Sequence, residues 1–372
     1  MNPLRRLERS DHILIALGHG VEDFDCFVRA HYFGFTALLI IGGAATSSRP
    51  VAIDTIVSLL VIAMCFHVFS YALNDVIDLD LDRTQPRRRN DPLVRGAISR
   101  RSALGIAFSG VPLSFLAVLY LADFKPRANP WALVTLALAF ALMSIYNSYG
   151  KKLDQPWVTD LVQAIAWGCL ALLGALAADP EPYPRLALAC SRAAVFFAYG
   201  ALFIFLINGI HGGLRDLVTD RAGGKNTLAI KLGANIGADG HVESNSRIMC
   251  FAYAVQTAMC ITVVIHVWKD RSHFPALWLT GLISTCLFLG NYLLLHRVVR
   301  MKERRRNFYV SFHLLTLLLP PLVILLTSST PDALTKAIVL FGFFLPLCFQ
   351  EPIPRRSVEI ILSQRGVKLA HS

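Results

Sequence analysis

Long uninterrupted apolar segments constrain this chain more than any other feature. They recur in blocks of about twenty residues, the length at which an α-helix crosses the hydrocarbon core of a bilayer. Of the 372 residues, 55% are hydrophobic and 16% are charged, whereas soluble domains carry about a quarter charged residues. The blocks therefore predict an all-α membrane protein with many spans. The expected spans cover approximately residues 27–46, 51–73, 103–123, 129–148, 158–178, 193–212, 249–268, 274–296, 308–327 and 333–350.

The basic residues lie mostly between these segments. A soluble chain with a formal net charge of +11 would suggest nucleic acid as a partner. Here Lys and Arg gather in the loops after the second, fourth, sixth and eighth segments, so the positive-inside rule places these loops and both termini in the cytosol. Orientation and an anionic ligand explain the charge, and no nucleic acid partner is expected. The sequence does not identify the organelle, for which the endoplasmic reticulum is a candidate.

The rest of the composition adds little chemistry. Residues 1–24 carry charges of both signs and no apolar core, so we expect a cytosolic segment there rather than a secretory signal. A transmembrane domain over 25–350 and a tail over 351–372 follow. The eight cysteines lack metal-ligand spacing, and we interpret them as packing residues.

Two of the expected cytosolic loops are acidic as well as basic. The first contains Asp75, Asp78 and Asp82 at spacings of three and four residues, so all three share one face if the second span stays helical to its end. The second loop, after the sixth segment, contains Asp216 and Asp220, again four residues apart. The equal spacing suggests two pseudo-equivalent halves, and the topology places both groups on one side of the membrane.

Carboxylates that gather at a membrane surface need cations to offset their repulsion. Hard oxygen ligands favour Mg²⁺, which usually binds through one or two carboxylates together with substrate phosphates. Two such groups on one side would clamp a diphosphate, and the metal would stabilise its charge as an allylic carbon–oxygen bond breaks. We therefore predict metal-binding and catalytic roles for Asp75, Asp78, Asp82, Asp216 and Asp220. Candidates to hold the diphosphate directly are Asn74, Arg83, Arg87, Lys151, Arg215 and Lys225.

Simpler interpretations exist for each of these residues. An acidic loop is often solvated and forms salt bridges with its own arginines, and a single Lys or Arg near a span is more often a positive-inside anchor. A calcium-binding helix-loop-helix is excluded, because Arg83 and Arg89 occupy the positions where that motif requires glycine and glutamate. The second acidic loop favours the diphosphate site over these alternatives.

Together these residues resemble the signatures of the UbiA prenyltransferase superfamily. The motif N-D-x-x-D-x-x-x-D is matched over 74–82, and P-L-x-x-G-x-x-S is matched over 92–99. The second aspartate motif, with its glycine, its threonine and a closing Leu-Gly, is matched over 216–233. The resemblance covers about residues 25–330. It implies a bundle of nine to ten transmembrane helices around a central cavity, with Mg²⁺ and an isoprenyl diphosphate at the cytoplasmic mouth.

The chain departs from the family pattern at several positions that bear on the acceptor. Gly213 stands where members often carry a further aspartate, Asp91 stands where an arginine usually precedes Pro-Leu, and the first span lacks a typical proline although it keeps Arg29. The tenth apolar segment is also additional. These differences leave the ionisation of the diphosphate intact.

Two enzyme functions follow from the resemblance. The first is transfer of the prenyl group to a lipophilic or aromatic acceptor. The alternative is an intramembrane terpene cyclase of secondary metabolism, which would convert a substrate such as farnesyl diphosphate into a cyclic terpene. A transporter is a third and weaker reading, because the acids gather in loops rather than within spans. Aromatic rings would stabilise either cation through their faces, and the candidates are Phe27, Tyr32, Phe33, Tyr71, Trp167 and Tyr199.

Overall fold

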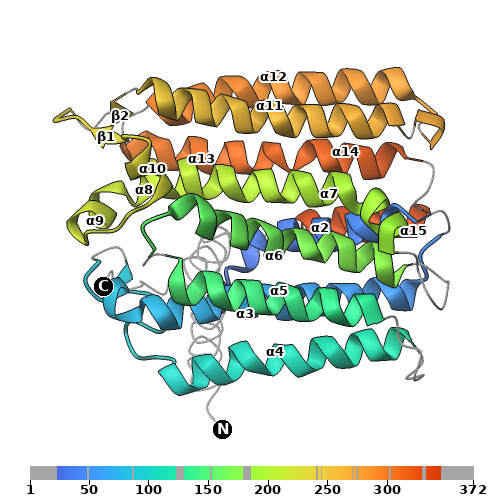
Figure 1. Cartoon of the computed structure of the whole chain (residues 1–372), viewed down its shortest axis with the longest axis horizontal. Helices are drawn as coiled ribbons and strands as arrows, with labels where there is room; N and C mark the ends of the chain where they lie inside the picture. Colours follow the sequence, from blue (N-terminus) through green and yellow to red (C-terminus); the bar gives the residue numbers. More distant parts are fainter. Residues whose placement is uncertain are drawn as a thin grey trace, which may run out of the picture.

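The computed structural model describes residues 23–47, 50–85, 88–122, 130–150, 153–178, 186–239, 242–243, 245–269, 271–273, 275–300, 303–328 and 332–344. Within these ranges the chain forms a bundle of long helices that lie side by side (Figure 1). The elements are η1 (Ala30–Tyr32), α2 (Phe33–Ala45), α3 (Ile53–Asp82), α4 (Arg100–Leu121), α5 (Pro130–Tyr149), α6 (Pro156–Ala177), α7 (Leu186–Leu206), η3 (Ile207–Gly212), α8 (Gly213–Arg215), α9 (Leu217–Ala222), α10 (Leu228–Lys231), β1 (Asn235–Ile236), β2 (Val242–Glu243), α11 (Ser246–Lys269), η4 (Arg271–His273), α12 (Leu277–Arg300), α13 (Glu303–Leu317), α14 (Leu319–Thr327) and α15 (Ala333–Phe344). The two short strands pair antiparallel.

The predicted all-α, multi-pass membrane architecture is confirmed. Eight helical segments of the described residues are long and apolar enough to cross a membrane, and they coincide with eight of the expected spans. The other two expected spans contain shorter helices, α2 with 13 residues and α15 with 12 residues. Residues 345–350, which we assigned to the tenth span, lie outside the described residues, so the number of spans stays a prediction.

The first predicted span is shorter than its apolar run suggests. Residues 23–28 are helical, but Arg29 adopts a left-handed backbone conformation with φ 52° and interrupts the helix, so α2 begins only at Phe33. A right-handed helix cannot continue through such a residue. The short turn η1 follows, and the chain then enters α2, of which all residues but Phe33 are buried.

Helix α2 packs closely on α6 through two glycines. A β-carbon placed on Gly43 would lie 1.8 Å from the carbonyl oxygen of Ala171, and one placed on Gly174 would lie 1.9 Å from that of Ile40. The backbones therefore touch at this crossing. Small residues permit such close approach between membrane helices, where van der Waals packing drives association.

Two prolines separate α13 from α14. Pro320 and Pro321 have no backbone N–H, so the carbonyls four residues earlier lose their helical donors. Side chains from other helices replace them: Asn291 donates to the carbonyl of Thr316 at 3.3 Å, and the Tyr199 hydroxyl donates to that of Leu317 at 2.5 Å. Tyr199 thus stabilises a helix break, which gives it a structural role beside the predicted cation-stabilising one.

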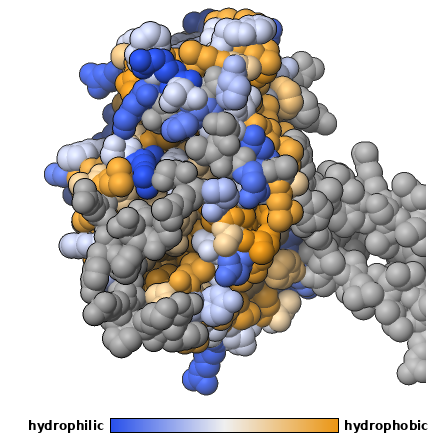
Figure 2. Space-filling model, turned by 90° about the vertical axis from the view of Figure 1, so that its right-hand side faces the viewer, coloured by the Kyte–Doolittle hydropathy of each residue, from blue (hydrophilic) through white to orange (hydrophobic). Residues whose placement is uncertain are grey.

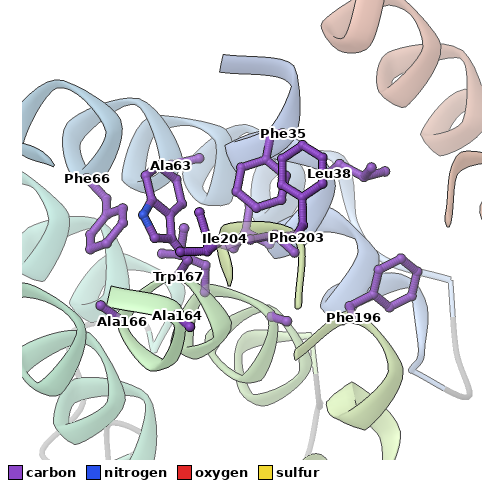
Figure 3. Close-up of a cluster of buried hydrophobic side chains, with 14 of the residues drawn as sticks. Phe35, Leu38, Ala63, Phe66, Ala164, Ala166, Trp167, Phe196, Phe203 and Ile204 are labelled. Carbon is purple, nitrogen blue, oxygen red and sulfur yellow. The ribbon is translucent and has the colours of Figure 1, made fainter. Parts of the chain in front are cut away.

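Aromatic rings fill the interior between α2, α3 and α6. Trp167 is central, with its ring 5.4 Å from that of Phe35 and 5.1 Å from that of Phe66 (Figure 3). The cluster extends to Phe203 on α7, whose ring lies 4.5 Å from Phe35. The ring centroid of Tyr71 also lies 6.4 Å from that of Trp167, and Tyr71 is one helical turn before Asp75 on α3.

The two ends of the bundle differ in what they carry. The connections that contain the acidic motifs lie at the left of Figure 1. The opposite end faces the viewer in Figure 2, where hydrophilic and hydrophobic residues are mixed. At that end Trp268 and Trp278 are largely exposed, and the guanidinium of Arg271 stacks over Trp268 at 5.6 Å. Exposed tryptophans are typical of a membrane–water interface.

Candidate active site

The two aspartate motifs meet at one end of the bundle. The chain that follows α3 and the segment α8 to α10 lie at the same end in Figure 1. A β-carbon placed on Gly223 would lie 3.9 Å from Cδ1 of Leu81, and the side chain of Asn226 donates a 2.8 Å hydrogen bond to Asp154 in the α5–α6 connection. Three connections that are distant in sequence therefore form one surface.

The first acidic group lies on the last turns of α3. Because the helix continues to Asp82, its spacing places Asp75, Asp78 and Asp82 along one face, as the sequence predicts. Asp75 is 7% exposed and Asp82 is 4% exposed. The side chain of Asn74 forms a hydrogen bond with Asp75. These carboxylates are largely withdrawn from water, so they require partners.

Arg29 is the partner of Asp75. Its Nη2 lies 2.5 Å from Asp75 Oδ1, and its guanidinium stacks 4.8 Å from the centroid of the Tyr71 ring. The backbone of Arg29 is fixed as well, because its carbonyl oxygen is 3.1 Å from Nε2 of His67, and Nδ1 of that ring is 2.8 Å from the hydroxyl of Thr36. A left-handed non-glycine residue that is held on all sides is typical of functional sites.

Arg88 is the partner of Asp82. Its Nε lies 3.9 Å from Asp82 Oδ1, and its Nη1 donates to Asp91 Oδ2 at 2.7 Å. Burial opposes the charge of Arg88, but Asp82 and the hydrogen bond to Asp91 outweigh burial and raise its pKa above the usual value. Asp91, which replaces the usual arginine of the family, therefore anchors another arginine in the same loop.

A small pocket opens beside this group. It is lined by the three carboxylates Asp75, Asp82 and Asp91, and by Cys26 and Pro92 among others. The thiol of Cys26 donates to Asp91 Oδ1 at 3.4 Å. Burial, and after it the charge of Asp91, raise the pKa of Cys26 to about 12, so the thiol stays neutral.

The second acidic group follows α8. Asp216 lies directly before α9 and its carboxylate accepts a 2.9 Å hydrogen bond from Nε of Arg215. Asp220, one turn later, is 7% exposed, and its Oδ1 is 3.1 Å from Nζ of Lys225. Arg215 also interacts electrostatically with Arg88, the partner of Asp82, so the second group lies near the first.

The segment that leads into the second group is a π-helix, η3. Wider turns of this kind are rare and are frequent at functional sites. His211 of η3 is buried, and its ring nitrogens are 3.1 Å from the carbonyl oxygen of Leu206 and 2.9 Å from Nδ1 of His313. His313 in turn contacts Gln256 at 3.0 Å. This chain of contacts ties the segment before Asp216 to α13 and α11.

Three motif glycines have left-handed backbones. Gly96 (φ 81°), Gly224 (φ 64°) and Gly233 (φ 84°) are the positive-φ glycines of the described residues. Side chains disfavour this conformation and glycine does not. The glycines of the motifs thus serve the path of the backbone around the acidic groups.

A polar cluster adjoins Asp78 on the membrane side. The hydroxyl of Tyr146 forms a hydrogen bond with Asn208 and interacts electrostatically with Asp78 and Asp160. The amide of Asn208 donates to Asp160 Oδ1 at 2.9 Å and to Gln163 Oε1 at 2.5 Å. A buried polar cluster formed by α5, α6 and η3 is therefore coupled electrostatically to the first acidic group through Asp78.

Not every predicted phosphate ligand reaches this surface. Arg83 is exposed and pairs with Asp80 at 3.3 Å, so the structure does not bring it to the acids. Arg87 and Lys151 lie outside the described residues. Sequence reasoning assigned no role to Arg88, which is one of three consecutive arginines, and only the course of the loop distinguishes it. It also left Asn208 out, because an asparagine within a span carries no motif.

The carboxylates suit magnesium only in combination with substrate. Within the described residues, no group of three or more His, Cys, Asp or Glu side chains is close enough to hold one metal ion. Mg²⁺ commonly takes one or two carboxylates and completes its shell with phosphate oxygens and water. The oxygen donors of Asp75, Asp78, Asp82, Asp216 and Asp220 fit that requirement, and the paired cations fit the phosphate.

These features define a class of protein, a polytopic helical membrane protein with two facing acidic motifs and their cations at one end. The family model of the UbiA prenyltransferase family matches residues 35–317, and the chain belongs to this family. Helix α15 lies beyond the region that the family model matches.

Two curated relatives match part of the chain. One is a lycopene elongase/hydratase of Corynebacterium glutamicum, 24% identical over 176 residues, which are 45% of this chain and 55% of the relative. The other is the prenyltransferase adrG of Penicillium rubens, 27% identical over 173 residues, which are 43% of this chain and 50% of the relative. The matched parts span about half the length of these relatives.

Solved structures share the fold. A UbiA homolog from Aeropyrum pernix K1 superposes with a TM-score of 0.59 and 22% identity, covering 79% of this chain and 95% of the homolog. A UbiA homolog from Archaeoglobus fulgidus, bound to GPP and Mg²⁺, superposes with a TM-score of 0.56 and 14% identity, covering 86% of this chain and 99% of the homolog. At these identities the likeness establishes the fold.

Proposed function

We propose that this protein transfers the prenyl group of an allylic isoprenyl diphosphate to a lipophilic or aromatic acceptor inside the membrane, with Mg²⁺ as cofactor. The observation that carries the proposal is that two acidic groups, each with its own basic partners, face each other at one end of an apolar helical bundle. A homolog of the same fold is bound to GPP and Mg²⁺. The diphosphate site that we propose comprises the five predicted aspartates with Asn74, Arg29, Arg88, Arg215 and Lys225.

In this proposal the protein first exchanges its internal ion pairs. Arg29, Arg88, Arg215 and Lys225 each lie beside a carboxylate, and they turn to phosphate oxygens when the diphosphate enters. The carboxylates thereby become available as oxygen ligands. Bound magnesium supplies charge stabilisation for the leaving diphosphate. The Tyr71 and Trp167 rings face the cation that remains, and the apolar interior excludes water.

Terpene cyclisation remains the second candidate, because it uses the same ionisation. Gly213, where many members carry an extra aspartate, bears on it: a β-carbon there would lie 2.7 Å from Cβ of Ala229 and 2.7 Å from the carbonyl oxygen of Asn208. Packing of η3 therefore leaves no room for a carboxylate at this position. A second acidic group without this extra aspartate is compatible both with transfer of the prenyl cation to an acceptor and with its cyclisation.

We place the active-site end in the cytosol, because the four connections after α3, α5, α7 and α12 together carry most of the Lys and Arg that lie between the spans and basic loops lie on the cytoplasmic side of membrane proteins. The same rule leaves the organelle open. Labelling of single cysteines introduced at exposed Arg83 and exposed Arg271 with an impermeant maleimide, in sealed vesicles of known orientation, tests this placement. Opposite accessibility of the two sites is expected, and accessibility of Arg271→Cys from the cytosolic side contradicts it.

Product analysis tests the reaction. Purified protein in detergent is given geranyl, farnesyl or geranylgeranyl diphosphate with Mg²⁺, with and without aromatic acceptors, and diphosphate release and organic products are measured. We expect release that depends on an acceptor, yields a prenylated product and stops when EDTA removes the metal. A cyclic hydrocarbon formed without acceptor identifies a cyclase, and absence of Mg²⁺-dependent release with every substrate rejects both enzymes.

A further inference from the structure

Asp160 is a buried carboxylate that the two aspartate motifs do not include. It lies near the start of α6, within a membrane-spanning helix, and is 7% exposed. Ionisable groups within spans are costly and usually functional. The diphosphate site proposed above assigns it no role.

One edge of the Asp160 carboxylate is fixed by the protein. Asn208 donates to its Oδ1 at 2.9 Å, while the same amide donates to Gln163 at 2.5 Å. Among the described residues, Oδ2 of Asp160 has no hydrogen-bond donor and no cation within ion-pair distance. Asp160 as a whole is buried, and a ligand that donates a hydrogen bond to Oδ2 would offset part of the cost of withdrawing this carboxylate from water.

Asp160 lies between the acidic end and the aromatic interior. Tyr146 interacts electrostatically with both Asp160 and Asp78, so Asp160 shares a neighbour with the first aspartate motif. Along α6, Trp167 follows seven residues later on the same helical face, and its ring contacts that of Tyr71. A prenyl diphosphate with its phosphates at the aspartates and its chain among these rings would hold its reactive carbon near Asp160.

Resting on the proposed transfer function, we propose that Asp160 binds the acceptor through a neutral hydroxyl group and acts as the base of the reaction. The bond between C1 of the prenyl group and the diphosphate oxygen breaks, and its electron pair leaves with the diphosphate. C1 forms a bond to the acceptor, at the hydroxyl oxygen or at a carbon conjugated with it. The hydroxyl proton passes to Oδ2 of Asp160; attack by oxygen then gives a neutral ether, and attack by carbon gives a neutral dienone that becomes the phenol when the proton on the alkylated carbon moves to the oxygen.

The charge around Asp160 disfavours an acidic acceptor. A carboxylate on the acceptor would bring another negative charge into an apolar space that already holds Asp160 and Asp78, where repulsion is weakly screened. The described cations nearest the site are already paired: Arg29, Arg88 and Arg215 each contact an acid. We therefore expect the enzyme to prefer as acceptor a phenol or enol that carries no carboxylate.

The test compares Asp160→Asn with the wild type and with Asp54→Asn, a control at an exposed acid in the first turn of α3, at the other end of that helix from the aspartate motif. Each purified protein receives farnesyl diphosphate, Mg²⁺ and either 4-hydroxybenzyl alcohol or 4-hydroxybenzoate. Prenylated product, Mg²⁺-dependent binding of farnesyl thiodiphosphate and the pH profile of kcat/KM are measured. For Asp160→Asn we expect transfer to fall by about 100-fold or more, thiodiphosphate affinity to stay within about twofold, and the limb of the pH profile that reports the base to disappear. Wild type and Asp54→Asn should both prefer the alcohol.

Each other outcome has a distinct meaning. Transfer by Asp160→Asn at the wild-type rate, or preference of the wild type for 4-hydroxybenzoate, overturns the role of Asp160. If Asp160→Asn loses both thiodiphosphate binding and transfer, Asp160 belongs to the diphosphate site and the proposed role as base is overturned. A second variant, Asp160→Glu, separates this result from misfolding: it must elute as the same monodisperse species as the wild type and share the defect. A cyclic hydrocarbon from the wild type without acceptor instead refutes the transfer function itself.

Discussion

The close crossing of α2 and α6 at Gly43 and Gly174 permits a prediction about stability. Glycine-to-alanine substitutions there should destabilise the protein, whereas the same substitution at an open helical glycine should not. In Gly43→Ala the new methyl group would meet the Ala171 carbonyl oxygen at 1.8 Å, and in Gly174→Ala it would meet that of Ile40 at 1.9 Å. Because the obstacle is backbone, no rotamer change removes it, and the helices must separate. Overpacking of this kind costs about 1–3 kcal/mol or more, whereas alanine gains about 0.5–1 kcal/mol over glycine in a helix.

Gly281 and Gly290 of α12 provide the control, because a β-carbon on either meets no atom within 4 Å. Alanine there should be neutral or stabilising by up to about 1 kcal/mol. The assay is thermal unfolding in detergent, followed by tryptophan fluorescence. We expect Gly43→Ala and Gly174→Ala to lower the apparent Tm and the two α12 variants to leave it unchanged or raise it. Equal Tm values for Gly43→Ala and Gly281→Ala would refute the close crossing.

Two further predictions concern the acidic end. Asp78→Ala or Asp216→Ala should abolish Mg²⁺-dependent turnover while the protein still inserts and elutes as wild type, because each substitution removes a metal oxygen rather than a packing group; normal activity in either variant excludes that loop from the site. The thiol of Cys26, whose pKa is raised to about 12 first by burial and then by Asp91, should react slowly with maleimide at about pH 8 and increasingly fast through about pH 10, because the thiolate is the nucleophile. Mass spectrometry of the alkylated peptide measures this rate, and a rate at about pH 8 equal to that of a free thiol would contradict the environment described for Cys26.

The helices could be predicted because their cause is local. An apolar run of about twenty residues has few other ways to satisfy its backbone in a bilayer, and the spacing of Asp75, Asp78 and Asp82 depends only on α3 remaining helical. The start of α2 could not be predicted, because nothing in the composition near Arg29 signals a left-handed residue. Its conformation depends on His67, a contact across two helices.

The basic residues of the candidate site show the same limit of prediction from sequence. Arg83, Arg87 and Arg88 belong to one short basic stretch, and nothing in the sequence distinguishes their roles. The fold of the connection after α3 turns Arg88 inward, while Arg83 stays at the surface. The contact between Asn208 and Asp160 joins residues 48 positions apart. Pairings of this kind arise from helix packing, which the periodicity of one segment does not encode.

The four carboxylate–cation pairs have a consequence for how a ligand would enter. Asp75, Asp82, Asp216 and Asp220 each contact a basic side chain, so the charge of these four carboxylates is largely compensated within the protein. Entry of a metal–diphosphate complex is then a swap of counterions at nearly constant net charge, with little long-range attraction to assist it. The selectivity of such an end would come from geometry at close range.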